Sequence, residues 1–193
     1  MPAAAYLHLA IVCILIGAQH LGRSFWNLAL RWALHIGIIG ALAIALYYTH
    51  AQFIVWSTGA APGIYLVPPY SGIGYMLFYA WWRFFAPYVL SGLLGLLFYY
   101  LAKKLNQRYD ERFFYPTEPA LIGFCVFMVG HPLWVVFLAS TLASFVLVLL
   151  VRRYLLKNTE RLALYPFWLP VTALFLVALP FLQKLDLFLL LKI

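Results

Sequence analysis

The feature that most constrains this chain is a series of apolar runs, each close to the 20 residues that a helix needs to cross a bilayer. The run at residues 133–151, for example, holds no charged side chain. Over the whole chain 66% of the residues are hydrophobic and 9% are charged, whereas soluble domains carry about 25% charged residues. No polar stretch is long enough to form a soluble module. The sequence therefore predicts an all-α, polytopic integral membrane protein, with residues 1–193 as one transmembrane helical domain.

Six transmembrane helices are expected. The predicted spans are residues 4–19, 28–48, 73–101, 119–129, 133–151 and 165–181. The connection at residues 49–72 is rich in Gly and Pro near its end, which predicts a break in regular helix. The third span is overlong, so it must tilt, kink near Pro87, or extend past the bilayer.

Basic residues fall in alternate loops, which predicts the orientation of the chain. Loops after the second and fourth spans hold no Lys or Arg, and the other three loops are basic. These three contain Arg23 and Arg31, then Lys103, Lys104, Arg108 and Arg112, and finally Arg152, Arg153, Lys157 and Arg161. Because basic loops stay on the cytoplasmic side, both termini are expected on the outer side. The net charge of +8 thus indicates membrane topology and not nucleic-acid binding. We expect a multi-pass protein of a bacterial cytoplasmic membrane, with the lipid bilayer as its immediate partner.

Five acids occur in the chain, namely Asp110, Glu111, Glu118, Glu160 and Asp186. Four of them have basic residues close by in the sequence, as solvated ion pairs do. Glu118 differs, because it stands at a predicted membrane boundary. One interpretation is a helix start in which Thr117 is the N-cap, Pro119 lies in the first turn, and the acid favours the helix dipole.

The second interpretation of Glu118 rests on a family resemblance. The segments "YPTEPALIGFCVFMVG", "LWVVFLASTLASFVLVLLVRR" and "LALYPFWLPVTALFLVAL" follow one another between residues 115 and 179. Their order resembles the C-terminal half of the type IV prepilin leader peptidases, a family of GxGD-type intramembrane aspartyl proteases. The resemblance places Glu118 where that family has its second catalytic aspartate. The motif glycines are replaced by Tyr115, Pro116 and Thr117, and the first catalytic aspartate has no counterpart in the first three spans.

An acid protease needs two carboxylates that share one proton. Asp110 and Glu111, in the same predicted loop, are the residues that such a mechanism would pair with Glu118. If the chain is an enzyme, the resemblance implies an intramembrane acid protease with these three as catalytic candidates. We expect instead a diverged, non-proteolytic relative that acts in envelope or surface-fibre biogenesis.

Neither a metal nor a bound cofactor is expected. His8, His20, His35 and His50 lie on or beside the first two spans, but twelve residues place His8 and His20 about 120° apart around one helix, which disfavours a pair of haems. Cys125 and His131 lack the spacing of metal ligands, and Cys13 is a further apolar-helix thiol.

Two further positions are candidates for interaction. Arg83, in "FYAWWRFFAPY", either reaches the outer surface, stacks on Trp81, Trp82 or Phe85, contacts a lipid head group, or pairs with Glu118. On the fifth span, Ala139, Ser140, Ala143 and Ser144 form a small-residue face, either for packing inside the bundle or for another membrane subunit.

Three classes of function therefore stay open. Besides the prepilin-peptidase-like protein, the chain fits a small scaffold or accessory subunit of a larger membrane complex. A transporter or channel subunit is disfavoured, because neither an inverted repeat nor a row of polar residues is visible.

Overall fold

Helices form all of the regular structure that is described. The computed structural model describes residues 2–19, 23–59, 62–109, 114–154, 157 and 164–182. Its α-helices are α1 (Pro2–Ala18), α2 (Arg23–Thr58), α3 (Ile73–Ala80), α4 (Ala86–Arg108), α5 (Glu118–Val129), α6 (Trp134–Tyr154) and α7 (Trp168–Leu182). Short helical turns are η1 (Gly63–Leu66), η2 (Trp81–Phe85) and η3 (Tyr165–Phe167). The all-α prediction is confirmed for this part of the chain.

Four of these helical segments are long and apolar enough to cross a membrane. They are Phe25–Thr58, Ile73–Arg108, Trp134–Tyr154 and Tyr165–Leu182. The apolar helices α1 and α5 are shorter. This set of helices is compatible with an integral membrane protein.

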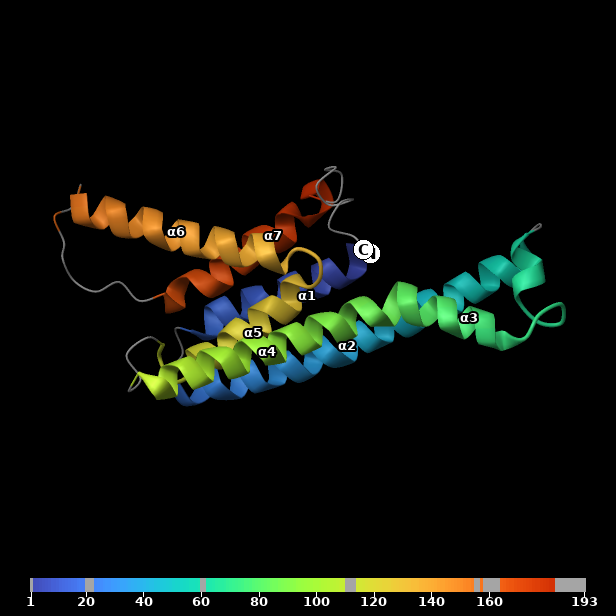
Figure 1. The fold of residues 1–193 in the computed structure, drawn as a ribbon, viewed down its shortest axis with the longest axis horizontal. Helices are drawn as coiled ribbons and strands as arrows, with labels where there is room; N and C mark the ends of the chain where they lie inside the picture. The colour runs from blue at the N-terminus through green and yellow to red at the C-terminus, as the bar shows by residue number, and fades with distance from the viewer. Residues whose placement is uncertain are drawn as a thin grey trace.

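Helix α5 forms the centre of the bundle (Figure 1). It contacts α2, α4, α6 and α7, and buried residues of α1 belong to the same core cluster. Eleven of its twelve residues are buried. At 1.5 Å per residue the helix is about 18 Å long, which is shorter than the ~30 Å hydrocarbon core. Because almost every side of α5 is apolar, it is stable only when other helices surround it.

The backbones of α4 and α5 touch where Gly95 crosses Gly123. A Cβ atom on Gly95 would lie 2.6 Å from the Gly123 carbonyl oxygen, and one on Gly123 would lie 2.7 Å from the Gly95 oxygen. Any side chain at either position would therefore push the two helices apart. This close crossing holds α5 in place along the length of α4.

The second predicted span is much longer than expected, and the third, predicted as overlong, extends to Arg108. Helix α2 has 36 residues, about 54 Å at 1.5 Å each, and it continues to Thr58. The prediction that residues 49–72 break the helix is therefore wrong for its first ten residues. These residues contain neither Gly nor Pro, and the hydroxyls of Thr49 and Thr58 donate to the carbonyls of Ala45 and Ile54. Gly59 is the first residue of the chain after this stretch that favours a break.

The two long helices continue past the bundle as a hairpin, at the right of Figure 1. We call residues 49–59 and 62–80 the distal hairpin. It is held by ring contacts of Trp56 with Tyr75 at 6.2 Å and with Tyr79 at 4.8 Å between centroids. A small cluster of Ala45, Ala80 and Phe84 closes its base, separate from the main core.

A π turn, η2, interrupts the third span directly before Pro87. The amide of Ala86 donates to the carbonyl of Trp81, five residues earlier. Proline has no N–H to donate to the carbonyl of Arg83, and its ring crowds that carbonyl, which explains the wider turn. The predicted distortion near Pro87 thus takes the form of a π turn.

Candidate functional site around Glu118

The Glu118 carboxylate is buried at the first residue of α5 and joins two helices. Its side chain is 1% exposed. One carboxylate oxygen accepts a hydrogen bond from the indole Nε1 of Trp168 at 2.9 Å. The other accepts from the backbone N–H of Tyr115 at 3.1 Å. Trp168 is the first residue of α7, so the carboxylate ties the start of α5 to the start of α7.

The expected helix start is confirmed in position, with Thr117 at the N-cap and Glu118 and Pro119 in the first turn, but the expected capping hydrogen bond is not formed. Thr117 occupies the N-cap position, but its backbone is already helical (φ −91°, ψ −12°) and its hydroxyl makes no capping hydrogen bond. The Glu118 side chain instead turns back to the amide of Tyr115, which precedes the helix. Glu118 therefore stands in the first turn of the helix, as expected, and is in addition a buried link between segments.

Burial dominates the electrostatics of Glu118, which lies outside the four candidate spans. Loss of water around the carboxyl raises its pKa, and the hydrogen bonds from Trp168 and Tyr115 lower it by less. Since burial penalises the charged form, the folded protein binds a proton at Glu118 more readily than an exposed glutamate does. A raised carboxyl pKa is also what a general acid needs, although structural acids show it too.

The other two catalytic candidates, Asp110 and Glu111, lie outside the described residues. The structure does describe both ends of the loop that carries them. Asn106, near the end of α4, is 6% exposed, and its amide nitrogen donates to the carbonyl of Phe114 at 2.9 Å. The backbone N–H of Phe114 donates back to the side-chain Oδ1 of Asn106 at 3.0 Å. This paired contact fixes the chain immediately before Tyr115, and so it positions the amide that Glu118 binds.

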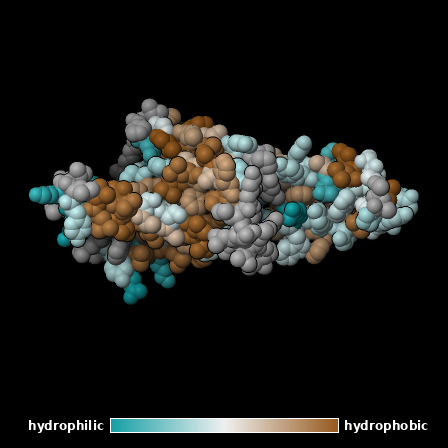
Figure 2. All heavy atoms as spheres, turned by 90° about the horizontal axis from the view of Figure 1, so that it is seen from above, coloured by the Kyte–Doolittle hydropathy of each residue, from teal (hydrophilic) through white to brown (hydrophobic). Residues whose placement is uncertain are grey.

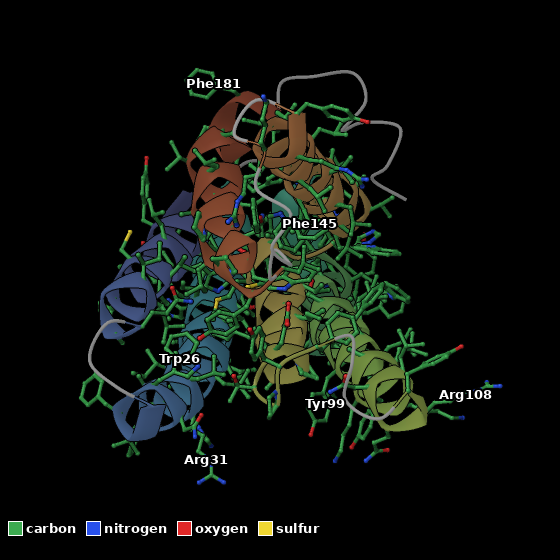
Figure 3. The ribbon with its side chains drawn as sticks, turned by 90° about the vertical axis from the view of Figure 1, so that its left-hand side faces the viewer. Trp26, Arg31, Tyr99, Arg108, Phe145 and Phe181 are labelled. Atoms are coloured by element: carbon green, nitrogen blue, oxygen red, sulfur yellow. The ribbon has the colours of Figure 1, made fainter. Side chains whose placement is uncertain are left out.

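Aromatic side chains enclose the Glu118 link. Tyr165 lies edge-on to Tyr115, with centroids 6.3 Å apart, and edge-on to Trp26 at 6.1 Å. Trp26 points into the bundle from the start of α2 (Figure 3) and is 4% exposed. Its indole Nε1 is buried without a hydrogen-bond partner among the described residues. A buried, unpaired donor therefore lies in the aromatic shell around the buried acid.

The remaining interaction candidates lie away from Glu118. Arg83 is exposed on the π turn, and Glu118 is bound by Trp168 and Tyr115, so the proposed Arg83–Glu118 pair is not formed. Ser140 and Ser144 are half-buried on α6, and the alanines beside them, Ala139 and Ala143, are exposed.

Two of the described histidines, His8 and His35, have a ring nitrogen within hydrogen-bond distance of a backbone carbonyl. The Nδ1 atom of His8 lies 3.0 Å from the carbonyl of Met128, and that of His35 lies 2.7 Å from the carbonyl of Arg31. His20 lies outside the described residues. Within the described ranges, no three His, Cys, Asp or Glu side chains are placed to hold a metal ion.

Trp168 and Asn106 are the site residues that sequence reasoning missed. Trp168 is 50 positions from its partner Glu118, and a tryptophan near a predicted membrane interface reads as a lipid anchor. The contact of Asn106 could have been predicted, because an asparagine at a helix end just before a charged loop often forms hydrogen bonds to nearby backbone.

Comparison of the chain with protein-family models, with curated proteins and with solved structures finds no match.

Proposed function

We propose that this protein is a non-catalytic scaffold or accessory subunit of a membrane complex, and that the distal hairpin binds its partner. The observation that carries the proposal is the surface of that hairpin. It has no charged residue at all, yet it extends beyond the bundle and exposes many large apolar and aromatic side chains. Those at least half exposed are Val55, Tyr65, Tyr70, Ile73, Tyr75, Leu77 and Phe78.

In the proposed topology six helical segments cross or enter the bilayer, and both termini lie on the outer side. Support comes from the clustering of the described basic residues other than Arg83 near the ends of α4 and α6 and in the first turns of α2. Arg31 and Arg108 point away from the bundle when it is viewed from this end (Figure 3). With that end cytoplasmic, the distal hairpin extends from the outer face.

Helix length explains why the bilayer alone does not cover the hairpin. Keeping about 54 Å of helix within a ~30 Å core requires a tilt of roughly 56°, beyond the usual range of 0–40°. The surface also changes character along the molecule: Figure 2 shows hydrophobic side chains gathered over α6 and α7, and a paler surface toward the hairpin. That paler surface fits the exposed Tyr65, Tyr70 and Tyr75, because tyrosine is enriched at protein interfaces.

The partner that fits this surface is an apolar helix of another membrane subunit that emerges on the same side. The absence of charge over residues 32–82 excludes recognition by salt bridges, and the exposed rings supply the rigid anchors that hot spots use. A polar or charged soluble protein would leave its own groups unpaired against this hairpin.

The test is site-specific photo-crosslinking in native membranes, with a photoreactive residue at Tyr70 in the distal hairpin or at Leu147 on α6. Both side chains are 62% exposed, so they are matched in access. We expect Tyr70 to give one discrete protein adduct that copurifies in near-equal amount, and Leu147 to give lipid adducts. Phe78→Asp should remove the protein adduct. Lipid adducts alone at both positions would overturn the proposal.

The second candidate is the diverged, non-proteolytic prepilin-peptidase-like protein of envelope or surface-fibre biogenesis. The observation that favours it is the burial of Glu118 at the start of a short, central helix, with its carboxyl pKa raised. Both carboxylate oxygens are already bonded, which supports a structural role for the acid. Glu118→Gln should therefore leave processing of a prepilin substrate at its background rate. Cleavage by the wild type that Glu118→Gln abolishes would instead assign a protease.

A further inference from the structure

Arg83 stands alone as a charge in a long apolar stretch. It is the only charged residue between Arg31 and Lys103, and its side chain is exposed on the π turn. Charged residues at membrane depth are rare and normally have a defined partner. The question is which group neutralises this guanidinium.

The described part of the protein offers no partner for Arg83. Glu118, the sole acid within the described residues, is bound by Trp168 and Tyr115. The rings next to Arg83 pair with one another instead: Phe78 with Trp82 at 6.3 Å, and Trp81 with Phe85 in a stack at 6.2 Å. The cation–π contact recorded in this part of the chain belongs to Lys103 over Tyr99.

Helix geometry places Arg83 at the level of lipid head groups. Twenty residues separate it from Lys103 on one continuous helical segment, which is about 30 Å at 1.5 Å per residue. That distance equals the thickness of the hydrocarbon core. With Lys103 and Lys104 at one interface, Arg83 lies at the other.

The neighbours of Arg83 are those of a membrane interface. Trp81 and Trp82 are 47% and 61% exposed, and Tyr48 of α2 stacks on Phe84 at the same level, with centroids 5.9 Å apart. Tryptophan and tyrosine are enriched at the head-group layer, where one side of the ring is apolar and the other is wet. A guanidinium between such rings faces the layer in which phosphates lie.

We propose that Arg83 binds the phosphate of an anionic phospholipid in the leaflet opposite to Lys103, with Trp81 and Trp82 against the lipid backbone. The planar guanidinium donates two parallel hydrogen bonds to phosphate oxygens, a geometry that lysine does not match. The inference rests on the placement of the helices in a bilayer and is independent of any partner of the distal hairpin.

The experiment uses the full chain in phosphatidylcholine nanodiscs that contain a trace of a phosphatidylglycerol analogue with a photoreactive head group. We expect its adducts on the peptide that contains residues 81–85, several-fold above those of the matching phosphatidylcholine analogue. Arg83→Gln should lower this labelling roughly fivefold, and about 0.5 M salt should lower it as well. Arg83→Lys should keep part of the preference.

Lys104→Gln is the matched control, because it removes an exposed cation from the opposite end of the same helical segment. It should leave labelling at residues 81–85 unchanged. Equal labelling by the two lipid analogues would overturn the inference, as would unchanged labelling in Arg83→Gln. A preference for the phosphatidylglycerol analogue that appears only in Asp186→Asn would also overturn the inference. Asp186, which lies outside the described residues, would then be the group that neutralises Arg83 in the wild type.

Discussion

The α5-centred bundle and the distal hairpin both contain many apolar side chains but have opposite surroundings. In the bundle, a core cluster runs through α1, α2, α4, α5, α6 and α7, and buried polar atoms such as those of Glu118 and Asn106 are hydrogen-bonded. In the hairpin, the associated cluster has three buried residues, and large side chains face outward. Hydrophobicity alone therefore does not tell a core helix from an interaction surface. The difference lies in which segments have neighbours.

Among the contacts that join the helices, the largest expected effect is the loss of the Glu118 link. Glu118→Ala leaves the buried indole N–H of Trp168 and the amide of Tyr115 without acceptors, and it opens a cavity. We expect a loss of about 2–5 kcal/mol in stability. Thermal unfolding in detergent, followed by circular dichroism, measures it. An unchanged melting temperature would show that the link between α5 and α7 contributes nothing.

The second effect tests the crossing of α4 and α5. Gly95→Ala places a Cβ against the carbonyl oxygen of Gly123, so the helices must separate, at a cost of roughly 1–3 kcal/mol. Gly92→Ala, three residues earlier on α4, is the matched control, since a Cβ there meets nothing within 4 Å. The control should be neutral or stabilising by up to about 1 kcal/mol, because alanine favours helix over glycine. Equal melting temperatures of the two variants would contradict the close crossing.

The third effect is the pH dependence of the bundle. The pKa of Glu118 is raised in the folded state, so its contribution to stability is full below the unfolded-state pKa and is lost as pH rises through the folded pKa. Wild type should therefore gain stability relative to Glu118→Gln as pH falls from 8 toward 5. Melting temperatures of both proteins across this range measure the difference. A gap that widens with rising pH would mean that the carboxylate, and not the acid, is the favoured form.

The sequence predicts the helices better than it predicts their surroundings. Apolar runs locate α1, α5, α6 and α7 to within a few residues, because length and hydropathy decide helix formation in such a chain. Helix α2 ends ten residues after its predicted end, because the Gly and Pro residues that break it begin only at Gly59. The partner of Glu118 could not be predicted, because Trp168 is brought to it by the packing of α7 and no local pattern records that contact.

The smallest expected effect on stability, in the distal hairpin, is the sharpest test of the comparison. Phe78 is 63% exposed, and its recorded ring contact is with Trp82, another exposed residue. Phe78→Ser should thus change the melting temperature of the purified protein very little, within about 0.5 kcal/mol of stability. Phe137→Ser is the counterpart in the bundle, where the ring is 0% exposed and contacts Trp168 and Phe175. That change should destabilise by about 3–5 kcal/mol, as for other large losses in a core. If both variants are equally destabilised, the hairpin is part of the folding core. Phe78→Ser could instead leave the melting temperature in detergent unchanged and lower the amount of protein retained in the native membrane. The Phe78 ring then contacts another molecule in the membrane, because a role in folding this chain would appear in both settings.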